Sequence, residues 1–448
     1  MNEYQSAKQI VSHVYAMARI LQVYDHRNEV VIKTGQKLLN YVTEGPAEIF
    51  RYREYLFLNK ERLRYEIDGY ESLHFIHNRL KELGVKALTF LPGLTQAELI
   101  NFMTLFSETK DAFDREFDLD RFPHLSLEFG EAEEASPELE MRTQQAKWRY
   151  FKALKVTKNL MSKIAVKQPV DSRTFRRAMF GLIDSLVEDE SGMLALTAIK
   201  NFDEYTYNHS LNVGVLSMAL GQRVGLNKAK LARLGTAGIL HDMGKLVIPK
   251  EVLYKEGPLT DEEWETMRRH ADQGVEQILK TRGVDEIGLI SILVSFQHHW
   301  NLDGSGYPDR GKDQQPALFS RIVRVCDTYD AMTTSRPYQK TPILPHYALQ
   351  VLWSHRDSWF DRLLVKVFTQ MLGVYPVTTC LELSSGEIAV VVRQNPGFVD
   401  RPVVKILRNS EKKEVEGVVI DLSVDSSLAI TKVVYPQQYG IDTASHII

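Results

Sequence analysis

Histidine and carboxylate residues gather in the middle of this chain. Five of the thirteen histidines lie between positions 209 and 299, and two of them stand directly before another possible ligand. A further carboxylate follows in the segment RIVRVCDTYDAM. The candidate metal ligands are therefore His209, His241, Asp242, His270, His298, His299 and Asp327.

This set of residue types indicates a particular chemistry. Mixed imidazole and carboxylate ligands suit hard or borderline divalent ions such as Mn, Fe, Zn or Ni, and no thiolate among them selects softer ions. Seven ligands exceed the four of a structural zinc site and suffice for two octahedral ions that share a carboxylate. Two ions about 3.5–4 Å apart act as a clamp for in-line displacement at phosphorus and acidify a bound water. The residue types therefore point to hydrolysis at phosphorus.

Each of these residues also has an ordinary structural interpretation. A lone histidine on an apolar helix is usually a satisfied core residue, His298–His299 could be a polar helix end, and Asp327 could cap a helix or form an ion pair. The order of the motifs HDMGK, HHWNLDGSGYP and CDTYDAM argues against chance. Because adjacent helical residues point about 100° apart, His241 and Asp242 can act together at a helix end, which Gly244 favours.

The motifs resemble those of the HD-GYP subgroup of the HD phosphohydrolase superfamily. The resemblance is detailed from Tyr205 to Tyr338 and looser over 171–376, and HDxGK followed by DGSGYP and RPY makes it specific. The matching strings are YTYNHS, HDMGKLVIP, PLTDEEWETMRRH, QHHWNLDGSGYP, RIVRVCDTYDAMTTSRPY and LGVYP. This family hydrolyses cyclic dinucleotides, mainly cyclic di-GMP, to linear pGpG and on to GMP in bacterial signalling, commonly with iron or manganese.

The resemblance implies a role for each matching residue. Lys245 would lie beside the phosphate, where its charge neutralises the charge that develops in the transition state. The expected catalytic residues are His241, Asp242 and Lys245. One metal ion would be held by His209, His241, Asp242 and Asp327, and the second by His270, His298 and His299, with Asp242 bridging the pair. The expected substrate contacts are Lys245, Trp300, Asp303, Gly306, Tyr307 and Pro308.

Two positions depart from the family pattern. Tyr205 stands where some members have a glutamate that binds a third metal, so two divalent ions are expected here, with slower processing to GMP. Trp300 follows the double histidine where many members have glutamate. Its indole could stack on a guanine, a contact of about 1–3 kcal/mol in nucleic-acid sites, or could simply pack beneath the loop that follows.

The DGSGYP loop and two arginines leave alternatives open. Gly304 and Gly306 permit backbone conformations or a close ligand approach that other residues do not, and Tyr307–Pro308 stiffens the exit from the loop. A structural turn with no role in substrate binding would explain the same residues. Arg324 and Arg336 carry guanidinium groups that match phosphate oxygens, but either could form a surface ion pair, so both stay outside the catalytic set.

Several functions fit these residues. The first is a metal-dependent phosphodiesterase for cyclic di-GMP. The alternatives are a catalytically weak HD-GYP module that signals by protein contact, and a phosphodiesterase for cyclic GMP-AMP. A nucleoside triphosphate hydrolase of the wider superfamily is disfavoured by DGSGYP. The complete ligand set favours an enzyme, because an abandoned site would be expected to lose ligands.

The elements that position these residues are expected to be mostly helices. The chain has 448 residues, of which 44% are hydrophobic and 25% charged, which is typical of a globular protein and excludes disorder as its main state. We predict a mainly α fold in which a helical HD-type phosphohydrolase domain spans 171–376. A small α/β domain at 1–130 and a linker helix at 131–170 precede it, and a small all-β domain at 377–448 follows it.

The N-terminal segment predicts a regulatory unit without a catalytic constellation of its own. Thr95 is expected to cap a helix, with Glu98 completing a capping box. The expected elements are two helices over 1–43, an extended run at Ile49–Leu58, a helix over 71–83 that ends at Gly84, a strand at Val85–Phe90, a helix to Phe106, and a strand at Leu125–Phe129.

The predicted linker helix lies at a reversal of charge. Acidic residues dominate 108–140, and basic residues dominate 142–177. The two segments could be solvated faces that pair with each other, or the basic segment Lys147–Lys167 could dock an acidic partner or an anionic surface. The apolar side of this helix is expected to carry Trp148, Phe151, Leu160 and Ile164. A homodimer formed through 141–167 is a further expectation.

Charge, cysteine content and hydropathy limit the partners. The net charge of −3 does not favour a nucleic-acid polymer as a partner. Cys326 and Cys380 are too few for a disulfide scaffold and fit a reducing compartment. The apolar run Ile287–Phe296 is shorter than the roughly 20 residues of a membrane span, and the N-terminus shows no basic leader, so we expect a cytoplasmic protein. A signalling protein could bind the GYP loop or the N-terminal domain.

Overall fold

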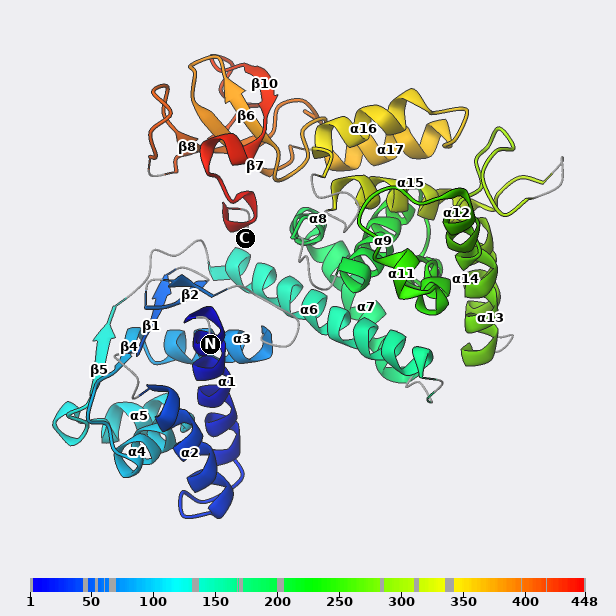
Figure 1. Cartoon of the computed structure of the whole chain (residues 1–448). Helices are drawn as coiled ribbons and strands as arrows, with labels where there is room; N and C mark the ends of the chain where they lie inside the picture. The colour runs from blue at the N-terminus through cyan, green and yellow to red at the C-terminus, as the bar shows by residue number, and fades with distance from the viewer. Residues whose placement is uncertain are drawn as a thin grey trace. The chain divides into compact units, whose positions relative to one another are not determined.

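The computed structural model describes most of the chain and divides it into two compact units, residues 1–141 and 142–448 (Figure 1). Each unit is described by itself. The described residues are 3–42, 47–52, 55–59, 61–63, 70–130, 137–166, 168, 172–199, 205–282, 286–309, 314–334, 342–395, 397–415 and 417–446.

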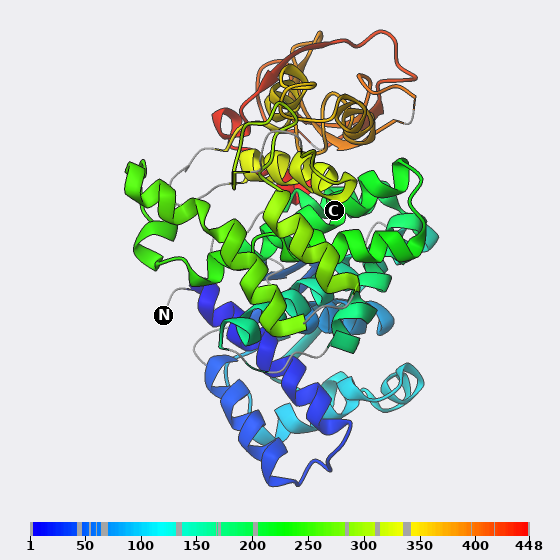
Figure 2. The ribbon, with the colours of Figure 1, turned by 90° about the vertical axis from the view of Figure 1, so that its right-hand side faces the viewer.

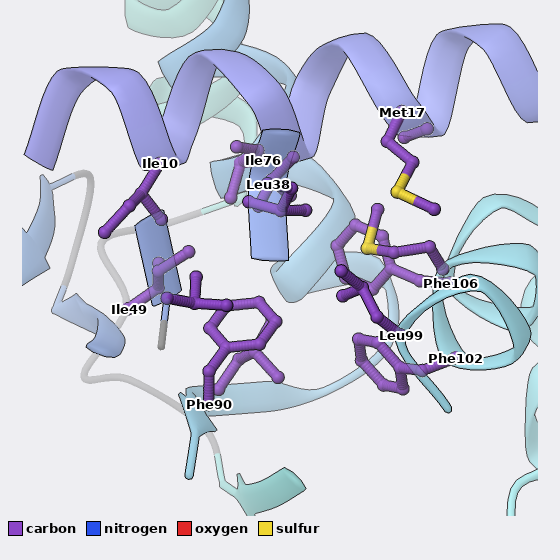
Figure 3. Packing of buried hydrophobic residues seen from close by; sticks show 14 of the residues in the cluster. Ile10, Met17, Leu38, Ile49, Ile76, Phe90, Leu99, Phe102 and Phe106 are labelled. Carbon is purple, nitrogen blue, oxygen red and sulfur yellow. The ribbon is translucent and has the colours of Figure 1, made fainter. Parts of the chain in front are cut away.

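The first unit packs helices against a five-stranded antiparallel sheet. The sheet order is β3-β2-β1-β4-β5, with the strands β1 (Ala47–Tyr52), β2 (Tyr55–Leu58), β3 (Glu61–Arg62), β4 (Val85–Phe90) and β5 (Leu125–Phe129). Its helices are α1 (Glu3–Leu21), α2 (Glu29–Val42), α3 (Tyr70–Glu82), α4 (Gln96–Ser107), α5 (Lys110–Glu116) and the short 3-10 turn η1 (Leu119–Arg121). In Figure 3 the side chains of Ile10, Ile49, Phe90 and Phe106 meet in one apolar core between these elements.

Two local predictions for this unit are wrong. The extended run Ile49–Leu58 is a hairpin, because β1 pairs with β2 in the register Tyr52↔Tyr55, and no glycine or proline in the sequence marks the reversal. Thr95 caps α4 by accepting a hydrogen bond from the Glu98 amide, as predicted. The Glu98 carboxylate, however, accepts a hydrogen bond from the His124 amide at 2.8 Å, so a distant segment takes the group that a capping box would use.

The second unit begins with a long helix and continues as a helical bundle (Figures 1 and 2). Helix α9 is buried along nearly its whole length and packs against α10 and α15, while α14 packs against α10 and α13. The helices are α6 (Pro137–Ala165), α7 (Ser172–Glu188), α8 (Glu190–Thr197), α9 (Tyr205–Arg223), α10 (Lys228–Leu240), α11 (Lys250–Leu253), α12 (Asp261–Arg268), α13 (His270–Arg282), α14 (Glu286–Gln297), α15 (Leu318–Thr333), α16 (Pro345–Ser354) and α17 (Arg362–Leu372).

Helix α6 forms as predicted, and three of the four residues expected on its apolar side are buried. Tyr150, Leu154 and Thr157 are buried in the second unit, as are Phe151, Leu160 and Ile164. Trp148 is 39% exposed, with the Lys152 ammonium nitrogen 4.2 Å from the centre of its ring. The helical period explains the difference, because Trp148 lies about 200° around the helix from Tyr150.

The segment after α17 is a small β domain. The strands β6 (Cys380–Leu383), β7 (Ile388–Arg393), β8 (Val403–Arg408), β9 (Val419–Asp421) and β10 (Ile430–Val434) form an antiparallel sheet in the order β10-β6-β7-β8-β9. Alternate residues of β7 enter two apolar clusters, with Ala389 and Val391 in one and Ile388 and Val390 in the other. Two 3-10 turns follow, η3 (Pro436–Tyr439) and η4 (Thr443–His446).

The fold is therefore mainly helical, with a small α/β region before the helical domain and a small β region after it. Among the described residues, none of the helices combines the length and the apolar character that a bilayer crossing needs.

Candidate metal centre

The structure brings all seven candidate ligands together from five places in the helical domain. His209 lies on α9 and Asp327 on α15, both inside long helices. The other five stand at element ends: His241 and Asp242 after α10, His270 at the start of α13, and His298 and His299 after α14. Two groups within this cluster have ligand atoms close enough to hold an ion, and Asp242 belongs to both.

The pair His241–Asp242 lies at a helix end, as its sequence predicts. Helix α10 ends at Leu240, and the chain continues into the 3-10 turn η2 (Met243–Val247). Gly244 lets η2 press against the start of α13, since a Cβ at this position would lie 1.9 Å from the His270 carbonyl oxygen. A glycine is required here, and the close approach places Asp242 beside His270.

The first half of the cluster mixes imidazoles with carboxylates. The His209 Nε2 atom lies 3.2 Å from the nearest Asp327 oxygen and 3.6 Å from Asp242. The His241 Nε2 atom lies 3.3 Å from Asp242 and 3.6 Å from Asp327. The Nδ1 atom of His209 donates to Asp330 at 2.8 Å, and that of His241 donates to the Gly238 carbonyl at 2.6 Å. Both Nε2 atoms are therefore left to face carboxylates.

The second half of the cluster consists mainly of histidines. The Nδ1 atoms of His270 and His298 donate to the backbone carbonyls of Met267 and Ser295, each at 2.7 Å. Their Nε2 atoms, which then carry lone pairs, lie 3.3 Å from each other. Each faces the same Asp242 oxygen, at 3.4 Å from His270 and 3.7 Å from His298, and the His299 Nε2 atom lies 3.1 Å from that of His270.

These donor atoms fit a divalent cation. The Nε2 atoms of His209 and His241 and one oxygen of Asp242 are buried and have no hydrogen-bond partner among the described residues. Unpaired buried polar atoms are costly, and lone pairs that point at each other repel. A cation between them would satisfy all of these atoms at once, and mixed imidazole and carboxylate ligands suit a borderline divalent metal.

The two halves have opposite electrostatics. Burial alone would lower the pKa of His209, but the carboxylates around it outweigh burial and raise the pKa to about 10. In the same way, Asp242 and Asp327 raise the pKa of His241 to about 9 against the effect of burial. In the second half burial dominates and lowers the pKa of His270 to about 3. The first half therefore attracts positive charge strongly, and the second half presents neutral imidazoles.

Lys245 lies at the junction of the two halves. Its ammonium group contacts the Asp242 carboxylate at 2.6 Å. Burial alone would raise the pKa of Asp242, but Lys245 and His241 hold it well below its usual range. Asp242 is thus an ionised carboxylate that faces four imidazole groups and one ammonium group.

A cavity of about 580 Å³ opens beside the cluster. Its lining includes four candidate ligands and Lys245, together with an apolar wall of residues from the segment 252–267. Trp264 belongs to this wall, and 45% of its side chain is exposed. The lining residues are Thr206, His209, Asp242, Lys245, Val252, Leu253, Gly257, Pro258, Leu259, Trp264, Met267, His270, His299 and Tyr307.

The GYP loop borders the cavity through its tyrosine. The Tyr307 ring stacks on His299, with the ring centres 4.4 Å apart. Gly306 has φ +100°, and a Cβ there would lie 2.2 Å from the His299 carbonyl oxygen, so only glycine fits. Asp303 accepts hydrogen bonds from the amide and hydroxyl of Ser305, and Pro308 is half-buried. Asp303 therefore stabilises the turn itself.

Trp300 lies under the loop. It is 3% exposed, forms a β-bridge with Gly306, and packs edge-on against Phe296 at 5.6 Å. It does not line the cavity. This placement favours packing over the stacking on a guanine that the sequence left open.

The two arginines have different outcomes. Arg324 donates to the Asn301 side chain at 2.9 Å and lies over the Phe360 ring, so it supports the loop from within and forms no surface ion pair in the described part of the chain. Arg336 lies outside the described residues, as do the other residues of the RPY motif and the side chain of Tyr205.

Sequence reasoning missed two residues of this region. Asp330 is fully buried and orients His209; its signal was the spacing CDTYD, which puts it one turn after Asp327 on the same helix. Trp264 was visible only as part of the string PLTDEEWETMRRH, where nothing marks it as a cavity residue.

Two family models match this chain. A model described as "HD domain" matches residues 186–364, and a model described as "KOW domain associated with HD domain" matches residues 380–441. The first segment contains all seven candidate ligands, together with the DGSGYP loop. Residues 186–364 are therefore similar to the HD domain family.

Curated proteins match parts of this chain. "Cyclic di-GMP phosphodiesterase PA4108" of Pseudomonas aeruginosa is 34% identical over 51% of this chain and 54% of its own length. "Cyclic di-GMP phosphodiesterase" of Thermotoga maritima is 32% identical over 38% of this chain and 45% of its own. "3'3'-cGAMP-specific phosphodiesterase 1" of Vibrio cholerae is 32% identical over 33% of each. The chain thus spans about half, or less, of the length of these relatives.

Proposed function

We propose that this protein is a metal-dependent phosphodiesterase of the HD-GYP type that hydrolyses a cyclic dinucleotide, with cyclic di-GMP as the preferred substrate and linear pGpG or GMP as the product. The observation that carries the proposal is the cluster of seven ligands that opens, beside Lys245, onto a cavity of about 580 Å³. Cavities of about 300–1,000 Å³ are typical of small-molecule sites. Relatives whose names state this activity support the assignment.

We propose two divalent ions, iron or manganese, as the cofactors. His209, His241, Asp242 and Asp327 would hold one ion, and His270, His298 and His299 the other, with one Asp242 oxygen facing each set. When bound, such ions polarise the phosphoryl group and lower the pKa of a coordinated water. Tyr205 stands at the position of a third-metal glutamate in some relatives, which supports two ions rather than three.

The residues of the chain have distinct proposed tasks. Asp242 links both positions, and Lys245 keeps Asp242 ionised and presents a positive charge to a phosphate in the cavity. Tyr307 is held by its stack on His299, and burial raises the pKa of its phenol, so the hydroxyl stays protonated and can donate a hydrogen bond. Gly306 and Pro308 shape the loop that carries it, and Asp303 braces that loop.

We propose that Trp264, rather than Trp300, offers the aromatic face for a guanine base. Its indole is partly exposed and lines the same cavity as the candidate metal ligands, whereas Trp300 is buried under the loop. A base on the wall and a phosphate at the cluster is the arrangement that a nucleotide needs, since its apolar and charged ends lie apart.

The assay that tests this function uses the full chain loaded anaerobically with iron or manganese. Cyclic di-GMP, cyclic GMP-AMP and linear pGpG are supplied separately, and products are identified by mass. We expect turnover of cyclic di-GMP, which the Asp242→Ala variant loses. Faster turnover of cyclic GMP-AMP would instead support the second substrate, and binding without any turnover would support a protein-contact module.

The remaining assignments concern organisation and partners. We propose a regulatory domain at 1–130, a linker helix at 131–170, the catalytic domain at 171–376 and a β domain at 377–448. The unit boundary after Met141 and the two matched segments support this division. A homodimer and a signalling protein as partner stay predictions. Light scattering of the full chain, and of a Trp148→Glu variant, tests the dimer through α6.

A further inference from the structure

We propose that Tyr150, on the linker helix α6, is a positioning residue for the metal ligand His209. It acts through Asn212 and Asp330, so that the seating of α6 sets the metal affinity of the first half of the cluster. The inference rests on the proposed metal-dependent function and names a control point of the same site.

A path of hydrogen bonds leads from Tyr150 to His209. The groups around its first hydrogen bond determine which partner donates. The Tyr150 hydroxyl lies 2.6 Å from the Asn212 Oδ1 atom. The Asn212 Nδ2 atom faces two acceptors, the Thr197 carbonyl at 3.0 Å and an Asp330 oxygen at 3.1 Å. Because both of these need an N–H, the amide oxygen must point at Tyr150, and the phenol must donate.

The path ends at a metal ligand. The second Asp330 oxygen accepts from the His209 Nδ1–H at 2.8 Å and from the Thr334 hydroxyl at 3.3 Å. Because the Nδ1 atom of His209 carries the proton, the lone pair is on Nε2, and it points toward Asp242 and Asp327. Asp330 thus determines both the tautomer and the ring orientation of the ligand, the usual role of a carboxylate behind a metal-binding histidine.

Every member of the path is buried, so water cannot replace a lost partner. Tyr150 is 1% exposed, and Asn212 and Asp330 are fully buried. Without the phenol, the Asn212 oxygen would be left unpaired, and a flipped amide would turn that oxygen against the Asp330 carboxylate. The pKa of the phenol, raised by burial and then by Asp330, keeps it protonated as a donor.

The helix that carries Tyr150 also leads along the chain to the N-terminal domain. Helix α6 runs without a break from Pro137 to Ala165. Next to Tyr150, Arg149 donates to the Ser185 hydroxyl and contacts Glu188, each at 3.1 Å, which anchors this turn of α6 on α7. A rotation or shift of α6 would lengthen the Tyr150–Asn212 hydrogen bond before it disturbed any ligand directly.

The test compares Tyr150→Phe with a matched control, Thr157→Val, in the full chain. Thr157 is a fully buried residue two turns later on the same helix, and its hydroxyl has no hydrogen-bond partner within the described residues. Both variants therefore remove one buried oxygen from α6. The readout is the dissociation constant for Mn²⁺, measured by competition with a chromophoric chelator, together with the number of ions bound and the melting temperature.

We expect Tyr150→Phe to weaken one of the two Mn²⁺ sites by about 3- to 10-fold, somewhat less than the 10- to 100-fold typical of a direct partner of a ligand. Thr157→Val should leave both sites unchanged. In a protein that already carries Asp330→Asn, Tyr150→Phe should cause no further loss of Mn²⁺ affinity, because the hydrogen bonds that connect Tyr150 to His209 are already broken at Asp330.

Equal effects of Tyr150→Phe and Thr157→Val, or additive losses with Asp330→Asn, would overturn the proposal. A wild-type protein that binds Mn²⁺ but turns over no cyclic dinucleotide would contradict the proposed function alone, and the ratio of affinities would still decide the role of Tyr150. A wild-type protein that binds no divalent ion would contradict both.

Discussion

The histidines in the two halves of the cluster have pKa values that are shifted in opposite directions. In the first half, His209 and His241 face carboxylates, and their pKa values are raised to about 10 and about 9. In the second half, His270, His298 and His299 face one another, and burial lowers the pKa of each. The difference teaches that burial by itself does not set the charge of a histidine, since the neighbours decide whether burial prevails.

One candidate ligand also differs from three others in what orients it. His209 donates to a buried side chain, Asp330, which belongs to a hydrogen-bonded path to another helix. His241, His270 and His298 donate to carbonyls of their own backbone turns, three residues earlier. We therefore expect a side-chain substitution at a distance to disturb His209 far more than these three histidines.

We expect the largest effect on metal binding and turnover from a substitution of Asp242, the residue that both halves share. Asp242→Ala should abolish binding of both ions and lower turnover by about 1,000-fold or more, since metal stabilisation of the transition state amounts to several kcal/mol. Elemental analysis and the phosphodiesterase assay measure this. The control is Asp272→Ala, which removes an exposed carboxylate on α13. Retention of one full equivalent of metal would show that the halves do not depend on a shared carboxylate.

The next prediction concerns substitutions that should each affect metal binding in one half of the cluster only. His209→Ala and His298→Ala should each lower the metal content from two ions to one. Asp330→Asn should imitate His209→Ala more weakly, with a 10- to 100-fold loss of affinity at one site, because it removes the partner that orients the ligand. Metal titration of the three variants measures this. If Asp330→Asn weakened both sites equally, the assignment of the ligands to two halves would be wrong.

We expect a smaller effect on kinetics from a substitution of Trp264, which lines the cavity. Trp264→Ala should raise KM about 5- to 100-fold with little change in kcat, since stacking on a base is worth about 1–3 kcal/mol. Trp353→Ala is the control, because this tryptophan of α16 is similarly exposed but does not line the cavity. Steady-state kinetics with cyclic di-GMP distinguish the two. A fall in kcat at constant KM would place Trp264 in the chemistry instead.

The smallest effect is a pH dependence of the metal-free protein. A histidine whose folded pKa lies below the ordinary value of 6.5, such as His270 with about 3, loses its contribution to stability as the pH falls below 6.5. His209, with a folded pKa of about 10, contributes fully below pH 6.5 and loses that contribution only as the pH rises toward 10.

Chelator-treated protein should therefore unfold at lower urea concentration at pH 5 than at pH 7. His299→Gln should reduce this difference, because it removes one of the histidines whose pKa is lowered. Urea titrations at several pH values measure it. An increase of stability on acidification would show that the carboxylate-rich half dominates the metal-free state.

Local structure was largely predictable from the sequence. Apolar periodicity placed the first two helices, and Gly84 marks the end of α3 with φ +67°. Strand β4 has the predicted bounds, because a short run rich in β-branched, aliphatic and aromatic residues between turn residues is a local signal. The hairpin inside Ile49–Leu58 escaped because its reversal carries no turn residue.

The contacts of single side chains were less predictable. Glu98 accepts a hydrogen bond from the amide of His124, which lies in a distant segment of the sequence. Trp148 turns outward and Trp300 packs under its loop, although their partners Lys152 and Phe296 lie only four residues away. Helical spacing restricts where a side chain can point but does not say what it meets.

The sequence by itself pointed to the seven candidate ligands, because imidazole and carboxylate groups are common donors to borderline divalent ions and the spacing of the motifs is read directly from the chain. The tertiary structure alone decided which imidazoles face carboxylates and which face one another. Electrostatic energy depends on distance and burial, and five separate elements must pack before any of those distances exists.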